Sequence, residues 1–221
     1  MWVANKCRGS LLHWDAQGFT RTDLMFVVLV CLSVGALVIS CETQPRRKRS
    51  ELTCPVNLKL IALACQTFQR EHSGFFPWAV STNRGGTLEF GASGNQTFRH
   101  FQILSVDLSA PRVLVCPQDS REAANSWNSL ENWNVSYFVG LDSEPNSPLS
   151  IVAGDRNVSS TASVILTLSR STPPKWEKGI GLHGDEGHVA FADGHVENLN
   201  SAGLSNALQQ VGNVTNRFAV P

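Results

Sequence analysis

The chain has 221 residues and equal numbers of basic and acidic side chains, 18 of each, so its formal net charge is zero. This length allows one domain with accessory segments, or at most two small domains. The balanced charge excludes an overall basic surface for nucleic acid. Only 16% of the residues are charged, and the composition is that of a globular protein with one strongly hydrophobic segment.

The hydrophobic segment runs from Leu24 to Ser40 without a charge. It is at the short end of what spans a bilayer as a helix, and it reaches an ordinary length if the helix starts at Phe19. A buried core helix would show a polar stripe, whereas this run has only Ser33 and Gly35. We therefore expect a transmembrane helix over residues 19–42. A cleaved secretory signal is the alternative, but the run is long for one and no clear cleavage site follows it.

The residues that open this segment, GFTRTDL at positions 18–24, resemble the cleavage/methylation signature of type IV prepilins and type II secretion pseudopilins. The resemblance implies cleavage between Gly18 and Phe19 and methylation of the new amino terminus. It gives Asp23 the place of a glutamate that pairs with the amino terminus of a neighbouring subunit, since a carboxylate in an apolar setting needs a partner. Asp23 is shorter than glutamate, and Arg21 stands where the family usually has an apolar residue.

A basic cluster, Arg46 to Arg49, follows the segment and is stronger than the basic start of the chain. Charge counting alone would place the C-terminal side in the cytoplasm, against the orientation that the resemblance implies. The same cluster also fits a processing site of a eukaryotic secretory protein. Four N-glycosylation sequons, which begin at Asn95, Asn134, Asn157 and Asn213, keep a eukaryotic type II membrane glycoprotein as a third interpretation.

Residues 54–72 show helical periodicity of apolar side chains. Pro55 suits the first turn of a helix and Pro45 suggests a break, so we expect an interrupted helix within a juxtamembrane region, residues 43–74. The six cysteines form no CxxC motif, which argues against zinc-ribbon and thioredoxin-like sites. A disulfide from Cys116 to either Cys54 or Cys65 would need an oxidising compartment.

Short apolar runs bounded by turn residues follow from residue 75 onward. The predicted strands cover residues 113–116, 135–141, 149–153 and 162–168, and short helices are predicted over 98–108 and 202–210. Several short strands after one long helix indicate an α+β fold. We expect a long N-terminal membrane-spanning helix followed by a pilin-like domain with an antiparallel β-sheet.

The strongest hairpin signal is Asp193-Gly194, a pair preferred in two-residue type I′ turns. This turn would pair Phe191 with Val196 and place both on the buried face. His195 would then lie on the opposite face of the hairpin.

Six side chains near this turn are of types that bind zinc or manganese: His183, Asp185, Glu186, His188, Asp193 and His195. Their spacing fits no helix-borne site, because no HExxH occurs. We expect no metal and no cofactor, with Asp185, His188 and His195 as the candidates if an ion binds. A signal-anchored extracytoplasmic domain that binds metal or hydrolyses a substrate remains the alternative function, with His183, His188, Asp193 and His195 as its residues.

His183, nine further residues and then Asp193-Gly194 resemble the H-x9-DG motif near the C-termini of prepilin-like proteins of planctomycetes and their relatives. The segments Asn57-Leu58-Lys59, Val115-Cys116-Pro117 and Gly154-Asp155-Arg156-Asn157 also resemble parts of those proteins. The resemblance covers residues 18 to about 197. It implies a pseudopilin-like architecture, and no enzymatic activity is established for the motif.

The sequence therefore predicts a leader (1–18), a transmembrane helix (19–42), a juxtamembrane and amphipathic helix (43–74) and an extracytoplasmic α+β domain (75–221). The expected function is a membrane-anchored, pseudopilin-like structural subunit of a type II secretion or type IV pilus-like assembly, and not an enzyme. The expected partners are a prepilin peptidase/methyltransferase, other pilin-like subunits and the inner membrane, without nucleic acid. The expected location is the bacterial inner membrane, single-pass, with a periplasmic C-terminal domain.

Overall fold

We describe the protein from a computed structural model. The described residues are 20–42, 46–92, 94–158, 165–169, 174–178, 182–211 and 215–221. The chain divides into two units, residues 1–45 and residues 46–221.

The described part of the first unit forms the helix α1 (Arg21–Glu42). It begins after Thr20, whose hydroxyl accepts a hydrogen bond from the backbone N–H of Asp23. The carboxylate of Asp23 in turn accepts one from the backbone N–H of Thr20, at 2.9 Å. These reciprocal bonds satisfy two groups that have no partner within the helix, and so they fix its start.

The prediction of a membrane-spanning helix is contradicted. No helix among the described residues combines the length and the apolar character needed to cross a membrane. The physical reason is the length of the uncharged part of α1, which is confined between Asp23 and Glu42 and falls short of the about 20 apolar residues that a bilayer requires. The predictions of a transmembrane helix over 19–42 and of a single-pass inner-membrane location with an extracytoplasmic domain are wrong on the same finding.

The second unit opens with α2 (Arg46–Glu71). Pro55 was predicted to lie in the first turn of a helix, and this is wrong because it lies inside α2; the break predicted at Pro45 lies outside the described residues. A proline in a helix interior costs about 3 kcal/mol. On either side of it Cys54 and Leu58 are completely buried, and this packing holds the helix together. The helix ends at Glu71, and the turn that follows it contains Ser73 and Gly74, both with positive φ.

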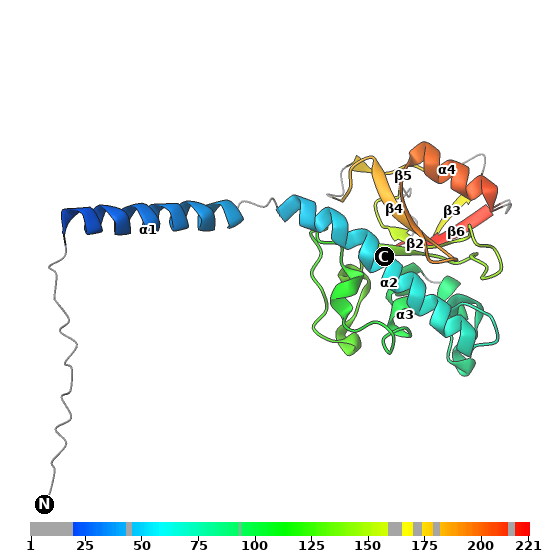
Figure 1. Cartoon of the computed structure of the whole chain (residues 1–221). Coiled ribbons are helices and arrows are strands. Elements are labelled where there is room, and N and C mark those ends of the chain that lie inside the picture. Colours follow the sequence, from blue (N-terminus) through cyan, green and yellow to red (C-terminus); the bar gives the residue numbers. More distant parts are fainter. Residues whose placement is uncertain are drawn as a thin grey trace, which may run out of the picture. The chain divides into compact units, whose positions relative to one another are not determined.

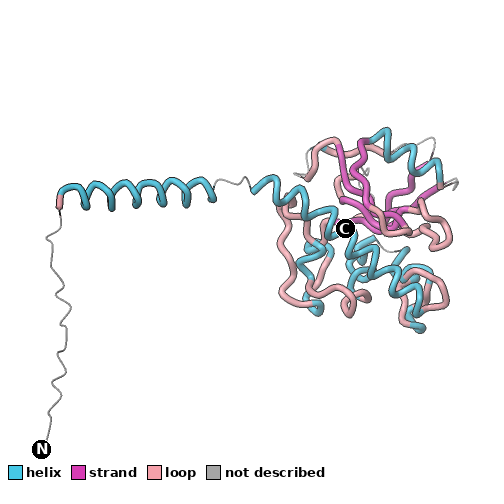
Figure 2. Tube along the Cα trace, viewed as in Figure 1, coloured by secondary structure: helices cyan, strands magenta, loops and turns pink. Residues whose placement is uncertain are grey.

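Between α2 and the sheet the chain forms short turns of 3-10 helix and one short α-helix, joined by loops (Figure 2). The α-helix is α3 (Thr97–Gln102), shorter than the helix predicted over 98–108. The 3-10 helices are η1 (Pro77–Ala79), η2 (Thr82–Arg84), η3 (Leu88–Ala92), η4 (Gly94–Gln96), η5 (Pro111–Leu114), η6 (Trp127–Ser129) and η7 (Asn132–Asn134). The strand predicted over 113–116 is absent, since η5 occupies the first half of that stretch.

The sheet has six strands in the order β3-β6-β1-β2-β4-β5, and every neighbouring pair is antiparallel. Its strands are β1 (Tyr137–Gly140), β2 (Ile151–Asp155), β3 (Ile165–Ser169), β4 (Glu186–Phe191), β5 (Val196–Asn200) and β6 (Thr215–Ala219). Helix α4 (Ser201–Gln210) follows β5 directly. The predicted α+β class with an antiparallel sheet is confirmed.

Successive side chains of a strand point to opposite faces of the sheet, and here both faces are buried. Tyr137 and Ala190 face the core that contains Cys54 and the other buried residues of α2. Phe138 belongs to a second core with residues of α4 and β6. The sheet is therefore covered by α2 and its following turns on one face and by α4 on the other (Figure 1).

Candidate functional site

The proposed processing residues, Gly18 and Phe19, lie outside the described residues. The proposed assembly residue, Asp23, lies in the first turn of α1. Its Oδ2 accepts hydrogen bonds from the backbone N–H and, at 2.7 Å, from the hydroxyl of Thr20. These two bonds lower the pKa of Asp23. The carboxylate is thus charged and already has a structural role within its own chain.

The H-x9-DG hairpin has a different register from the predicted one. β4 and β5 pair Ala190 with Val196, and the backbone N–H of Phe191 donates to the carbonyl oxygen of His195. The connection is therefore a three-residue loop. A type I′ turn needs positive φ at both central residues, whereas in this loop only Gly194 has it, at 88°.

The one-residue shift moves side chains to the other face of the hairpin. Val196 packs with Ala190 on the α2 side, whereas Phe191 belongs to the α4 side. The ring of His195 stacks on the ring of Phe191 with centroids 4.2 Å apart, and its Nδ1 contacts the carboxylate of Asp193. Asp193 and Gly194 of the motif thus shape the turn, and His195 packs on the strand that leads into it.

His183, the first residue of the motif, lies in a different group of side chains. The register that sets Gly154 opposite Val189 places Asp155 of β2 beside His188 of β4. The Oδ2 of Asp155 lies 3.0 Å from Nδ1 of His188 and 3.5 Å from Nε2 of His183. The two imidazole rings meet edge to face with centroids 4.4 Å apart. The structure therefore gathers two histidines around one carboxylate.

Asp155 is completely buried. Among the described residues its ionic contacts are the two histidines, and its Oδ1 has no hydrogen-bond partner. The neighbouring Arg156 does not neutralise it, because that guanidinium makes a bidentate pair with Asp119 at 2.7 and 2.8 Å. Burial opposes ionisation of Asp119, but hydrogen bonds from Arg156 and Ser136 outweigh it and lower its pKa.

A disulfide joins Cys54 of α2 to Cys116 after η5 and borders this group. Nε2 of His183 lies 3.4 Å from Sγ of Cys116. The structure thus selects Cys54 from the two partners that the sequence left open for Cys116. Cys65 is a free thiol, and burial raises its pKa.

The three residues named as candidate metal ligands do not come together. Asp185 is exposed and pairs with Lys178 at 3.2 Å, and its pKa is lowered by the hydrogen bond from that lysine. His195 contacts Asp193 and Glu197 near the turn. His188 alone lies beside the buried Asp155.

A different set satisfies the distances of a metal site. Ligand atoms of Cys54, Cys116, Asp155 and His183 all lie within 4.8 Å of one another. Sequence reasoning missed Asp155 and treated Cys116 only as a disulfide residue. Both lie in segments that resemble parts of the prepilin-like proteins, Gly154-Asp155-Arg156-Asn157 and Val115-Cys116-Pro117, and that resemblance was the available signal.

A pocket of about 500 Å³ lies beside this group. The pocket is lined by Gln118, Leu182, His183, Gly184, Glu186, His188 and Asn198. Two of these residues, His183 and His188, also contact the buried carboxylate of Asp155.

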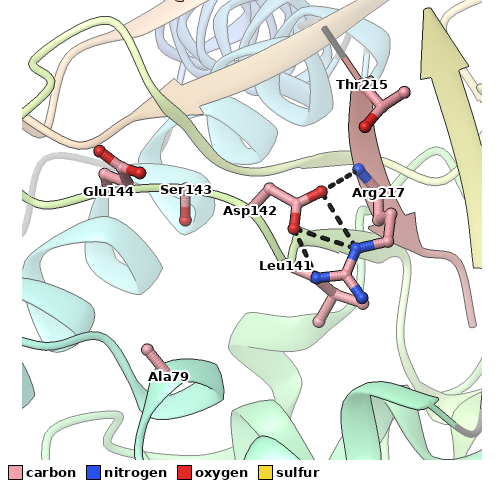
Figure 3. Close-up of a pocket in the computed structure, with 7 residues that line it drawn as sticks. All are labelled: Ala79, Leu141, Asp142, Ser143, Glu144, Thr215 and Arg217. Atoms are coloured by element: carbon pink, nitrogen blue, oxygen red, sulfur yellow. Dashed lines mark hydrogen bonds and ion pairs between the residues drawn. The ribbon is translucent and has the colours of Figure 1, made fainter. Parts of the chain in front are cut away.

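A second pocket, of about 450 Å³, lies between the end of β1, η1 and β6 (Figure 3). Arg217 holds it closed on one side by pairing with Asp142, whose Oδ2 accepts from the Arg217 backbone N–H at 2.7 Å and whose Oδ1 lies 3.0 Å from Nε. The hydrogen bond that Arg217 donates to the Asp142 carboxylate raises the pKa of Arg217. This pair connects β6 to the loop after β1 and neutralises the charge of Arg217.

Comparison of the chain with protein-family models, with curated proteins and with solved structures finds no match in any of the three.

Proposed function

We propose that the protein is a pseudopilin-like structural subunit of a type II secretion or type IV pilus-like assembly, and not an enzyme. In this proposal a prepilin peptidase cleaves between Gly18 and Phe19, and the new amino terminus is methylated. The proposal combines the signature at residues 18–24 with one observation, the exposure of α1.

The large apolar side chains of α1 from Leu24 to Val34 are exposed. Met25 and Phe26 are each 74% exposed, and Leu32 is 69% exposed. Exposed apolar area costs about 25 cal/mol per Å² relative to burial, and contiguous apolar patches mark surfaces that bind a partner. A helix that is apolar all round is normally surrounded by other apolar groups. The α1 helices of further copies or of related subunits provide such a cover.

Asp23 has a carboxylate oxygen, Oδ1, that is available to accept a hydrogen bond from a neighbouring subunit. Both hydrogen bonds from Thr20 reach its Oδ2, and among the described residues Oδ1 has no partner. A carboxylate oxygen can therefore accept from the ammonium group of a neighbouring subunit's cleaved terminus. Charge-assisted bonds of this kind are stronger than neutral ones, so one such contact sets the axial position between two otherwise apolar helices.

The turn between β4 and β5, which contains Asp193 and Gly194 of the H-x9-DG motif, packs against α2. Nε2 of Gln66 in α2 donates to the carbonyl oxygen of Ala192 at 2.8 Å. A Cβ atom at Gly194 would lie 3.2 Å from the same Nε2. The turn is thus fitted to α2, which agrees with a structural use of the H-x9-DG motif.

Processing is tested by analysing the amino terminus of the full chain produced in cells with and without a prepilin peptidase. We expect mass spectrometry to find a chain that begins with methylated Phe19 only when the peptidase is present. Gly18→Leu should abolish cleavage, because the bulky side chain blocks the scissile position, whereas Gly9→Leu in the leader should be cleaved normally. An intact leader on the wild-type chain in peptidase-containing cells would refute the proposal.

Variants of Asp23, produced in the same peptidase-containing cells, distinguish cleavage from assembly. Asp23→Ala should be cleaved and methylated but lose cross-links between copies, and Asp23→Glu should retain both. Equal cross-linking of Asp23→Ala and wild type would remove Asp23 from the proposal while leaving the cleavage site intact.

A further inference from the structure

We propose that Cys54, Cys116, Asp155 and His183 form a four-ligand site for Zn²⁺ when the Cys54–Cys116 disulfide is reduced. This site goes beyond the proposed structural function and does not depend on it. In the oxidised chain the two sulfurs are bonded to each other; in the reduced chain the same sulfurs become metal ligands.

The ligand set is of a type that structural zinc sites use. Thiolate, imidazole and carboxylate all bind Zn²⁺, and four of them complete a tetrahedron. Zinc–ligand distances of about 2.0–2.3 Å imply edges of roughly 3.3–3.6 Å between nitrogen and oxygen or sulfur ligands. The observed separations match these edges: Nε2 of His183 lies 3.4 Å from Sγ of Cys116 and 3.5 Å from Oδ2 of Asp155.

The buried carboxylate is the second, independent observation. Asp155 is completely buried and its Oδ1 lacks a hydrogen-bond partner among the described residues. Burying a carboxylate is costly unless it is paired or binds a metal. A cation bound by Asp155 and the two sulfurs compensates the charge of this carboxylate, and two thiolates with one carboxylate leave the occupied site with one net negative charge.

Neighbouring groups hold the carboxylate in place. The backbone N–H of His188 donates to Oδ2 at 2.6 Å, and Nδ1 of the same residue lies 3.0 Å from that oxygen. A carboxylate only accepts, so Nδ1 carries the hydrogen. Such outer contacts orient metal ligands and raise their affinity. The pocket lined by His183 and His188 lies beside the site.

Reduction needs two electrons and two protons, which a dithiol supplies. The dithiol becomes a cyclic disulfide, and Cys54 and Cys116 become thiols. Zn²⁺ then binds both sulfurs and displaces two protons. The sulfurs, 2.06 Å apart in the disulfide, must separate to roughly 3.8 Å around the ion, as tetrahedral geometry requires. Because Cys116 lies after η5 and not within a strand, this side can move without breaking the sheet.

Metal binding is measured on the full chain with Co²⁺ as a spectroscopic substitute and with Zn²⁺ by native mass spectrometry. The chain is reduced with a phosphine, desalted without oxygen and compared with the oxidised chain. We expect the reduced chain to bind one ion, with a sulfur-to-cobalt charge-transfer band and the intense visible bands of tetrahedral Co²⁺. The oxidised chain should show neither band.

Variants assign the ligands. His183→Asn keeps both cysteines and the disulfide, and should weaken binding by about 100-fold or more, beyond the 10–100-fold typical of outer-contact changes. The double variant Cys54→Ser/Cys116→Ser should lose the charge-transfer band, and His195→Asn, away from the site, should bind as wild type does. The proposal is overturned if the reduced wild type binds no metal, if the oxidised chain binds equally well, if His183→Asn binds as tightly as wild type, or if the band persists unchanged in the double variant.

Discussion

His100 of α3 is completely buried, and its ring nitrogen Nδ1 lies 2.8 Å from the hydroxyl oxygen of Thr87. Its Nε2 has no partner among the described residues. The ring meets Trp78 edge to face, with centroids 6.4 Å apart. Burial in these surroundings lowers the pKa of His100 to about 4, so the folded protein keeps this ring neutral.

This residue makes stability depend on pH. Between the ordinary histidine pKa of 6.5 and about 4, the unfolded chain binds a proton that the folded chain does not. Stability therefore falls as the pH drops through this window and loses about 3 kcal/mol from this group. Urea unfolding at pH 7 and at pH 4 measures the loss.

One variant identifies the group responsible. His100→Gln should reduce the pH dependence across this window, because its side chain does not titrate. This variant and wild type are unfolded in urea at the same two pH values. An equal slope in wild type and His100→Gln would contradict the assignment.

At the scale of elements, the sheet was the most predictable part of the molecule. β1 and β2 lie within or beside the stretches predicted at 135–141 and 149–153, because their apolar runs are bounded by turn residues. The hairpin register was wrong by one residue, since Asp193-Gly194 suits a two-residue turn and also a three-residue loop with glycine last. Side-chain packing on two faces decides between them, and a local pattern does not contain that information.

The pairing of β1 with β2 requires glycine at position 140, and the sequence alone does not reveal this requirement. A Cβ atom built on it would lie 1.9 Å from the carbonyl oxygen of Ile151. That oxygen belongs to the neighbouring strand, so the clash falls on backbone and not on a flexible side chain. Gly140→Ala should therefore destabilise the protein by about 3 kcal/mol or more.

The control for this change is Gly91→Ala in η3. A Cβ atom there meets only side-chain atoms of Leu141, the nearer at 3.7 Å, which is ordinary van der Waals contact. Thermal unfolding should show a large loss of stability for Gly140→Ala and little change for Gly91→Ala. Similar melting temperatures for the two variants would show that β1 and β2 can separate to accept the methyl group.

At the scale of the whole molecule, the disulfide ties α2 to the turns that precede the sheet. It joins residues 62 apart in the sequence, and closing a loop of that length in the unfolded chain is worth about 4 kcal/mol in the chain-entropy model. Reduction in the presence of a chelator should lower the free energy of unfolding by about 2–4 kcal/mol. Urea unfolding of the oxidised and reduced chains measures the difference.

The double variant Cys54→Ser/Cys116→Ser is the reference for this measurement. It should have the same stability under oxidising and reducing conditions. A similar loss on reduction in the variant would assign the effect to another cysteine.

The site around Asp155 could not be found from spacing in the sequence. Its residues come from α2, from the stretch after η5, from β2 and from the segment before β4, and only the strand register and the α2 packing bring them together. Metal motifs that sequences reveal have ligands a few residues apart. The membrane prediction failed for the opposite reason, because a local apolar run was given more weight than the charges that bound it.

The disulfide also decides how the chain responds to tension. A pull between the two ends of the oxidised chain passes from Cys54 directly through the sulfur bond to Cys116. Residues 55–115, including most of α2 and all of α3, then form a closed loop that carries none of the force. When the disulfide is reduced, the force also acts on residues 55–115, and their length is added to the length over which the chain can extend. The redox state of one bond thus sets how far the chain extends under force.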